Sequence, residues 1–522
     1  MKATMYAVPE GPGLTLDEAF MLYQGRLSVD ELDEKKRECV AGDTEDSPTE
    51  IVLKADAVYE LTAEGIEITR PLTITGRHAT LCGHGKAGFC ILSGNVLLKD
   101  FTMQGFEVNV EIDGRDAIIE HIHLKNIRFT HLCGCAVQTG TTKSRGGIRD
   151  LLIENCRFEN NDEQESGNVT AGYASIAMNA ASCRDERDLE DVVLEDVCVR
   201  DCVFRGSSRE TVNVMGGTCG GMFSGSIAHC KRTAMKNLKF LNNDFEGSYD
   251  ATINVITGFM HNDGGSCDGL EIAGNRIVFG LWGIFVIAGE PVVNTVEEVH
   301  IKNIRIHDNH LVMRALGCGE PSCGIAVNGG RLDFYTAVCR NCGVDGVHIF
   351  NNYIEGSHRG ISVDGGHSLL DGDPPSEVSG CYVQDILIEG NEMKDVGEPF
   401  RFFGTYMEGR RYDWKIGIPP ADIEWQKPVE DHSRLTYAAR GNLIKDLRCV
   451  NNSINGFSYM LRASGALARG HGLIKDNTVS GLVFEGNEFT GGENHLQAAD
   501  VLAEDWVRDE GGNHIDVKGI KP

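Results

Sequence analysis

Asp364 has the sequence surroundings of a catalytic carboxylate. It ends the alternating stretch 361–363 and directly precedes a double glycine, so its side chain should point outward from a core-facing strand, beside a turn. Cleavage of a glycosidic bond needs two carboxyl groups about 5 to 10 Å apart, one as proton donor and one as base or nucleophile. Asp364 is therefore a candidate catalytic residue, and a turn hydrogen bond is the structural alternative.

Asp250 and Glu210 are the candidate catalytic partners of Asp364. Each occupies the turn before the corresponding strand of an earlier repeat. Carboxylates on neighbouring repeats of one face would satisfy the spacing that glycosidic cleavage needs. Ordinary solvated surface carboxylates are the alternative for both.

Other polar side chains fall near the same face and are candidate ligands for substrate hydroxyl or carboxylate groups. Arginine in such a place binds a carboxylate or pairs with an acidic side chain. Trp414 belongs to a long aromatic stretch, 404–446, that forms either a platform over a cleft or a small core of its own. The candidate substrate-binding set is Asn213, Asn254, His261, Asp263, Arg359, His367, Arg401, Trp414 and Arg462.

A repeating unit must position these residues. The stretch 346–366 reads strand, asparagine turn, strand, glycine turn, strand, and the same order recurs from 150, 236, 269, 385, 447 and 482. Such short strands cannot bury a face alone, so equivalent strands must stack at about 4.8 Å per repeat. The unit predicts a parallel β-solenoid, with an internal ladder of Asn155, Asn243, Asn275, Asn309, Asn352, Asn391, Asn452 and Asn487.

With these turns the chain resembles the right-handed parallel β-helix proteins of the pectate-lyase-like superfamily, over roughly residues 50–495. The resemblance implies an all-β solenoid. It leaves the reaction open, because that superfamily holds lyases, hydrolases, epimerases, transferases and phage spikes.

Alignment of the strand after each glycine turn predicts which residues face the core and which form a flat outer face. Alternation places the second set outward, polar at its ends and partly apolar in its middle, as a sugar-binding surface would be. The core set is Val137, Ile176, Val212, Ile253, Ile284, Ile325 and Ile361, and the outward set is Gln138, Ala177, Asn213, Asn254, Phe285, Ala326 and Ser362.

Three parts are expected: an N-terminal capping segment (1–49), the solenoid (50–495) and a C-terminal cap (496–522). The first should contain a helix within 15–40, with Ser28 and Glu31 as a capping box. Long insertions after the outward strand should be loops that wall a cleft.

Composition narrows the partners. The formal net charge of −28 argues against nucleic acid and anionic membranes, which need a basic surface. The 18 cysteines, with no apparent secretory signal, indicate reduced thiols and a cytoplasmic location. No cofactor is expected, although Asp371 and Asp373 are possible calcium ligands.

The sequence thus predicts a carbohydrate-active enzyme that cleaves or rearranges a glycosidic bond by carboxylate catalysis, as a glycoside hydrolase or intramolecular transglycosidase. The partner is an oligosaccharide or polysaccharide, and the protein is a monomer or a homo-oligomer. A polysaccharide lyase or uronate epimerase, with arginines binding the carboxylate, is the first alternative. A non-catalytic glycan-binding or spike protein is the second.

Overall fold

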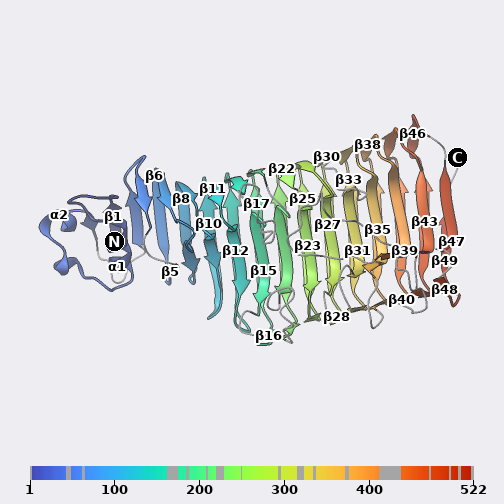
Figure 1. The fold of residues 1–522 in the computed structure, drawn as a ribbon, viewed down its shortest axis with the longest axis horizontal. Helices are drawn as coiled ribbons and strands as arrows, with labels where there is room; N and C mark the ends of the chain where they lie inside the picture. Colours follow the sequence, from blue (N-terminus) through green and yellow to red (C-terminus); the bar gives the residue numbers. More distant parts are fainter. Residues whose placement is uncertain are drawn as a thin grey trace.

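The chain is a single right-handed parallel β-helix, seen side-on in Figure 1 with its strands stacked along the long axis. The computed structural model describes residues 3–42, 49–61, 65–161, 174–183, 187–206, 210–218, 228–248, 250–291, 295–313, 322–332, 337–370, 376–410, 437–469, 472–492, 495–503 and 507–518. No helix among these is long and apolar enough to cross a membrane.

Three sheets run along the solenoid, and every strand pair between coils is parallel except β1 with β2. The 13-stranded sheet consists of β5 (Ile66–Ile68), β7 (Phe89–Ile91), β9 (Val108–Ile112), β12 (Cys135–Thr141), β15 (Ile176–Ser182), β19 (Val212–Thr218), β23 (Ala251–Phe259), β27 (Trp282–Glu290), β31 (Cys323–Leu332), β35 (Arg359–Leu370), β39 (Glu398–Arg410), β43 (Leu461–Arg469) and β47 (Leu496–Ala503). The nine-stranded sheet consists of β16 (Leu189–Glu190), β20 (Cys230–Lys231), β24 (Asn262–Asp263), β28 (Thr295–Glu297), β32 (Val338–Arg340), β36 (Ser376–Ser379), β40 (Tyr437–Arg440), β44 (Gly472–Lys475) and β48 (Val507–Asp509).

The 27-stranded sheet gives two strands to most coils. It consists of β1 (Ala3–Ala7), β2 (Val40–Ala41), β3 (Thr49–Leu53), β4 (Val58–Glu60), β6 (Leu72–Cys82), β8 (Val96–Gln104), β10 (Ile118–Lys125), β11 (Arg128–Leu132), β13 (Gly147–Glu154), β14 (Arg157–Asn161), β17 (Val193–Arg200), β18 (Val203–Arg205), β21 (Ala234–Leu241), β22 (Asp244–Ser248), β25 (Ser266–Ala273), β26 (Arg276–Phe279), β29 (His300–His307), β30 (His310–Met313), β33 (Gly343–Phe350), β34 (Tyr353–Glu355), β37 (Tyr382–Glu389), β38 (Glu392–Lys394), β41 (Leu443–Val450), β42 (Ser453–Asn455), β45 (Thr478–Glu485), β46 (Glu488–Thr490) and β49 (His514–Lys518).

One coil runs through β33, β34, β35 and β36, and the next begins where Tyr382 pairs with Gly343. The stretch 346–366 is therefore most of a coil rather than a whole one. The double glycine does not end the outward strand, because β35 continues to Leu370. The segments predicted to be loop insertions contain the strands of the nine-stranded sheet. In their described parts they therefore contribute strands to each coil and do not form loops that wall a cleft.

The predicted direction of the side chains is confirmed. All seven residues assigned to the core are fully buried, and strand pairing keeps them in one register from Val137 to Ile361. Their neighbours, from Gln138 to Ser362, keep the parallel register on the outer face. Apolar alternation was thus sufficient to orient this sheet, although the outward residues Asn254, Phe285, Ala326 and Ser362 are buried as well.

The asparagine ladder is confirmed for seven of its eight predicted members. Each side-chain Nδ2 donates to Oδ1 of the next asparagine at 2.8–3.0 Å, in the series Asn243, Asn275, Asn309, Asn352, Asn391, Asn452 and Asn487. A second series joins Asn442, Asn477 and Asn513.

Asn155 does not belong to the ladder. It has the left-handed backbone of the corner (φ 52°). The ladder position of its coil is the next residue, Cys156, which aligns with Cys202 of the following coil. The N–H of Cys202 in turn donates to Asn243 Oδ1, the start of the ladder. At each such corner, therefore, one residue adopts the left-handed backbone and the next residue forms the ladder hydrogen bond. In the pair Asn351 and Asn352, the first turns the chain (φ 53°) and the second hydrogen-bonds.

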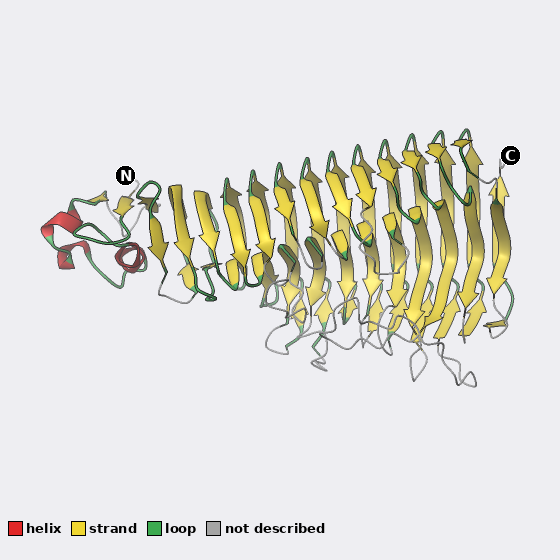
Figure 2. Ribbon diagram, turned by 45° about the horizontal axis from the view of Figure 1, so that its top comes forward, coloured by secondary structure: helices red, strands yellow, loops and turns green. Residues whose placement is uncertain are grey.

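The N-terminal segment is helical but not one helix, as Figure 2 shows in red. Helix α1 (Leu16–Tyr23) is capped by Thr15 and Glu18 and is followed by Gly25 at φ 69°. The predicted box of Ser28 and Glu31 caps a single 3₁₀ turn (Val29–Glu31), and α2 (Glu34–Arg37) follows. A positive φ cannot continue a helix, which is why the expected single helix is broken.

Both ends of the solenoid extend beyond the expected bounds. Strand β1 pairs in parallel with β3, so stacking begins at Ala3. At the other end β47, β48 and β49 pair with the coil before them, so the repeat does not end at 495 but continues to Lys518. Residues 496–503 of the expected C-terminal cap are thus strand β47 of the 13-stranded sheet.

A row of glycines brings the 13-stranded sheet against the 27-stranded sheet. A Cβ on Gly365 would lie 2.8 Å from the backbone nitrogen of Leu443, and one on Gly404 would lie 2.8 Å from that of Thr478. Gly329 has the same relation to Tyr382. Only glycine fits such a close approach of two backbones. In β35 the strand bends at this row, because Asp364 Oδ2 and His367 Nδ1, on either side of Gly365 and Gly366, lie 2.9 Å apart.

Candidate active site

The candidate active site lies on the outer face of strands β35, β39 and β43, on both sides of the glycine row. Strand register aligns Ser362 with Arg401 and Arg462, and Asp364 with Phe403. Beyond the bend, His367 aligns with Tyr406. Charged side chains on a flat sheet face are usually exposed, but here Asp364, His367 and Arg401 are only 1–2% exposed.

Asp364 and His367 form a hydrogen-bonded pair, with 2.9 Å between Asp364 Oδ2 and His367 Nδ1. The other carboxylate oxygen, Asp364 Oδ1, is buried, and no described residue forms a hydrogen bond with it. A carboxylate on Nδ1 fixes the imidazole tautomer so that Nε2 is the basic atom. The pair has the arrangement of an oriented general base.

Arg401 lies beside this pair, stacked on aromatic rings. Its guanidinium carbon is 3.8 Å from the ring centre of Tyr406 and 4.8 Å from that of Phe403. Both Nη atoms are buried and have no hydrogen-bond partner in the part of the chain that the structure describes. An arginine has five donors, and burying its charged head without partners is costly. These two nitrogens therefore offer the fork that binds a carboxylate.

The electrostatics agree with this geometry. Burial raises the pKa of Asp364, but the charge of Arg401 and the contact with His367 outweigh it, so the pKa lies below its ordinary value. Burial and then the nearby charge of Arg359 lower the pKa of Arg401. An added anion would offset both effects through its direct attraction to the guanidinium of Arg401.

Glu398 and Arg462 form an ion pair at the edge of the cluster. Arg462 Nη1 lies 2.5 Å from Glu398 Oε1, and Arg462 Nε donates to Gln497 at 2.8 Å. Burial raises the pKa of Glu398, but the charges of Arg401 and Arg462 lower it by more. The pKa of Glu398 is therefore below its ordinary value. Arg462 thus already has a carboxylate, in contrast to Arg401.

The structure brings together five of the residues predicted from sequence: Asp364, His367, Arg359, Arg401 and Arg462. The guanidinium carbon of Arg359 lies 5.7 Å from the Tyr406 ring centre, which places it at the same cluster.

The predicted catalytic partners lie elsewhere. Asp250 precedes Ile256, which aligns with Asp364 only after three strand pairings. This places Asp250 about 14 Å away along the axis and about 20 Å away along the strand. Glu210 is one coil more distant, since the N–H of the following residue, Thr211, donates to the carbonyl of Ala251, the residue after Asp250. Neither can act with Asp364 on one glycosidic bond, because the two carboxyl groups would have to lie within about 10 Å of each other.

The remaining candidates are also distant or undescribed. Asn254 donates to Asn213 at 3.2 Å on the outer face, with Asn254 three coils before Ser362. His261 stacks on His229 at 3.5 Å between ring centres, and Asp263 lies in β24. Trp414, Asp371 and Asp373 lie outside the described residues.

Sequence reasoning missed Glu398 and assigned Tyr406 to a loop. Glu398 pairs in register with Arg359 and is 5% exposed. Strict alternation would place Glu398 on the same face as the core residue Phe400, two positions on, so the strand pattern gave no signal for it.

No metal cluster is evident within the described ranges, where no three His, Cys, Asp or Glu side chains are placed to hold an ion. Cys339, Cys342 and Cys381 are buried thiols of the coil interior.

Comparison with known proteins gave no matching family model and no matching curated protein. Similar solved structures include the A-module of Azotobacter vinelandii mannuronan C-5 epimerase AlgE6, at 11% identity over 88% of this chain and 91% of that one, with a TM-score of 0.19. The PL6 family alginate lyase AlyGC is 10% identical over 88% and 97%, with a TM-score of 0.15. Bacteriophage CBA120 tailspike protein 3 is 10% identical over 90% and 57%, with a TM-score of 0.15. The chain's own strand pairing identifies it as a right-handed parallel β-helix.

Proposed function

We propose that the protein is a carbohydrate-active enzyme that removes the proton next to the carboxylate of a uronate sugar and eliminates the glycosidic oxygen, as polysaccharide lyases do. The observation that carries this proposal is Arg401, which is fully buried and whose two Nη atoms have no hydrogen-bond partner among the described residues. A uronate carboxylate would supply the two acceptors that this fork lacks.

Carboxylate binding also prepares the chemistry. The ion pair with Arg401 would draw negative charge from the sugar carboxylate and stabilise the charge that develops there when the adjacent proton leaves. Because the site is buried, this stabilisation is stronger than it would be in water.

His367 is the base in this proposal. Its Nε2 takes the proton from the carbon next to the carboxylate, while Asp364 holds Nδ1–H. The electron pair left on that carbon forms a double bond to the neighbouring carbon, and the bond from that neighbour to the glycosidic oxygen breaks. His367 returns the proton to the departing oxygen, so the enzyme ends in its starting state.

Hydrolysis is a second candidate, favoured by the two carboxylates Asp364 and Glu398 on adjacent coils of one face. A hydrolase needs one of them protonated near neutral pH. Both instead have pKa values below the ordinary range. Such carboxyl groups are ionised at neutral pH, so they suit ion pairs with arginine better than proton donation.

The test incubates purified protein with defined uronic and neutral oligosaccharides and follows near-ultraviolet absorbance and new reducing ends together. Elimination gives both signals from uronates only. Hydrolysis gives reducing ends without absorbance. Incubation in deuterated water identifies epimerisation, which incorporates deuterium without cleavage.

Arg401→Gln and Arg401→Lys test the assigned binding residue. Arg401→Gln should lower kcat/KM on order of 10²-fold or more, and Arg401→Lys should restore only part of it, because lysine lacks the planar fork. Arg205→Gln is the control: Arg205 pairs with Asp244 in the 27-stranded sheet and should leave turnover unchanged. Turnover of neutral sugars alone would contradict the proposal.

A further inference from the structure

We infer that the substrate is a mixed polysaccharide, in which a uronate unit is flanked by neutral sugars, and that it is bound across the coils of the outer face. This inference rests on the proposed function and adds the class of chain that the site accepts. It follows from the charges around Arg401 and from the uncharged polar groups that lie on either side of it.

The charged side chains around Arg401 leave room for one added carboxylate. Among the described residues the cluster has one more arginine than carboxylates, with Arg359, Arg401 and Arg462 against Asp364 and Glu398. Burial lowers the pKa of the neighbouring His358, so that imidazole adds no charge at neutral pH. With His367 unprotonated, as a base must be, the formal excess is a single positive charge. One uronate would balance this charge, whereas a second would leave a buried negative charge uncompensated.

The next arginine on this face already has a carboxylate beside it. Arg331 lies one coil before His367 and in register with it. Its Nε is 3.9 Å from Glu290 Oε1, and both side chains are buried. Its guanidinium carbon lies 4.3 Å from the ring centre of Phe285 and 5.1 Å from that of Trp282. In the pair of Arg331 and Glu290 the two charges balance, so the pair supplies no excess charge for a second uronate.

Uncharged polar atoms continue the site along the solenoid axis. Strand register places four outward residues in one row, Asn328, Asp364, Phe403 and Ser464. Asn328 Oδ1 and Ser464 Oγ are buried, and neither forms a hydrogen bond with a described residue. A buried polar atom without a partner is costly. The hydroxyl groups of a neutral sugar would supply a donor to Asn328 Oδ1 and either a donor or an acceptor to Ser464.

This row is long enough for an oligosaccharide. Asn328 lies two coils before Arg401 and Ser464 lies one coil after it. At about 4.8 Å per coil, the strands of Asn328 and Ser464 are about 14 Å apart. A chain that contacts both therefore runs along the solenoid axis, with its uronate at Arg401 and neutral units on both sides.

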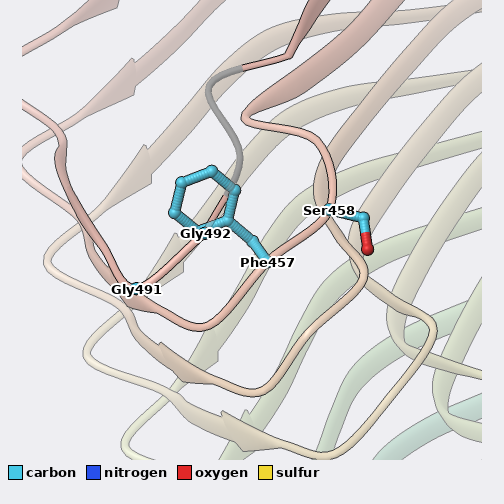
Figure 3. Close-up of a pocket in the computed structure, with 4 residues that line it drawn as sticks. All are labelled: Phe457, Ser458, Gly491 and Gly492. Carbon is cyan, nitrogen blue, oxygen red and sulfur yellow. The ribbon is translucent and has the colours of Figure 1, made fainter.

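A hollow beside the C-terminal end of this row is also uncharged. It has a volume of about 490 Å³ and is lined by Phe457, Ser458, Gly491 and Gly492, within the range of roughly 300–1,000 Å³ common for small-ligand sites. Figure 3 shows the ring of Phe457 over the backbone at Gly492, with Ser458 beside it. Ser458 precedes Tyr459, whose ring centre is 5.3 Å from the guanidinium carbon of Arg462, so the hollow adjoins the cluster. A described lining of aromatic, hydroxyl and backbone groups suits a neutral sugar.

The charge of the whole chain favours the same class of substrate. Its formal net charge is −28, and such a protein repels a polyanion before any contact forms. A polysaccharide with neutral sugars between its uronate units carries less charge per length and is repelled less.

The test compares two oligosaccharides of equal length, one built only of uronate units and one in which neutral sugars flank each uronate. Elimination is followed by near-ultraviolet absorbance. The mixed oligosaccharide should have a kcat/KM at least about tenfold higher, because the second carboxylate of the other would be buried against uncharged groups. Equal or faster turnover of the pure uronate chain would overturn this inference and leave the proposed function standing. Absence of elimination from every uronate-containing chain would overturn both.

Asn328→Leu and Ser464→Ala test the two flanking positions. Each should lower kcat/KM for the mixed oligosaccharide about tenfold, the effect of one lost hydrogen bond. Neither should lower the thermal midpoint, because Asn328 Oδ1 and Ser464 Oγ have no hydrogen bond to a described residue to lose. Unchanged turnover in both variants, or a loss of activity explained by a lower midpoint, would overturn the inference.

Gln138→Leu is the matched control, since it makes the same change from an amide to an apolar side chain. Gln138 is an outward residue of β12 in the same sheet, six coils before Ser362. This variant should leave the kcat/KM of both oligosaccharides unchanged. An equal loss in Gln138→Leu and Asn328→Leu would show that the effect is not local to the site, and would count against the inference.

Discussion

Asp364 and His367 lie three residues apart in one strand, yet their side chains meet at 2.9 Å. In a straight strand, residues at this spacing point to opposite faces and their Cα atoms are about 10 Å apart. The bend at Gly365 and Gly366 is what brings the carboxylate to the imidazole. The candidate active site thus depends on a backbone feature inside the coil as much as on the residues that face outward.

Asp364→Asn should reduce kcat on the order of 10⁴-fold, the scale seen when an aspartate that orients a catalytic histidine is replaced. The amide offers a donor where the carboxylate accepted from His367 Nδ1, and so favours the wrong tautomer. Kinetics together with the thermal midpoint of unfolding check this. A fully active variant would exclude Asp364 from the reaction.

Gly365→Ala should abolish activity and lower the free energy of unfolding by about 1–3 kcal/mol or more. Its Cβ would lie 2.6 Å from the Gly404 carbonyl oxygen and 2.8 Å from Leu443 backbone atoms, none of which can move aside. Gly140→Ala, in β12 of the same sheet, first meets the Ser182 Cβ at 3.0 Å, and should cost less and spare turnover. Denaturant titration of both variants measures the difference.

Asn352→Gly should be strongly destabilising and Asn351→Gly close to neutral, although the two residues are adjacent. Asn352 donates to the Ile306 carbonyl and Asn391, and accepts from Asn309, all while buried. Its loss leaves several buried groups unsatisfied, at about 1–3 kcal/mol each. Asn351 takes φ 53°, which glycine adopts readily. Equal midpoints for the two variants would contradict the division of tasks described above.

Glu154→Gln should lower stability at neutral pH but not in strong acid. Hydrogen bonds from Lys125 and Arg200 lower the pKa of Glu154 to about 2, against the opposing effect of burial. A carboxyl group with a lowered folded-state pKa stabilises the fold above its unfolded value of about 4.5, and this stabilisation is lost as pH falls through about 2. Unfolding midpoints of the wild type and variant should therefore converge between pH 4.5 and 2. A constant difference across that range would show that packing, not charge, is responsible.

The fold was predictable from sequence because each coil repeats the same local rules. Apolar alternation oriented the outer strands correctly from Val137 to Ile361, and paired asparagines marked the corners. The ends of the strands were harder to predict from sequence. Gly365 and Gly366 resemble a turn, yet β35 continues through them to Leu370, and the glycines let two sheets come into contact there.

The candidate site was predictable in part for the same reason. His367, Arg359, Arg401 and Arg462 were found because they share a face with Asp364. The partners Asp250 and Glu210 were misplaced because position within a coil was considered without counting the coils between them. Glu398 was missed because it interacts with Arg462 of the next coil, a contact that no spacing along one strand reveals.

Both asparagine ladders have the same direction. Every linking Nδ2–H, from Asn243 to Asn452 and from Asn442 to Asn477, donates toward the C-terminal coil. Aligned amide dipoles add, as they do in a helix, so each ladder is positive at its C-terminal end. The second ladder finishes where Asn513 Nδ2 donates to Asp509 at 2.7 Å, which places a carboxylate at the positive pole. The solenoid is therefore electrically polar along its axis, and its two ends are not equivalent for the addition of further coils.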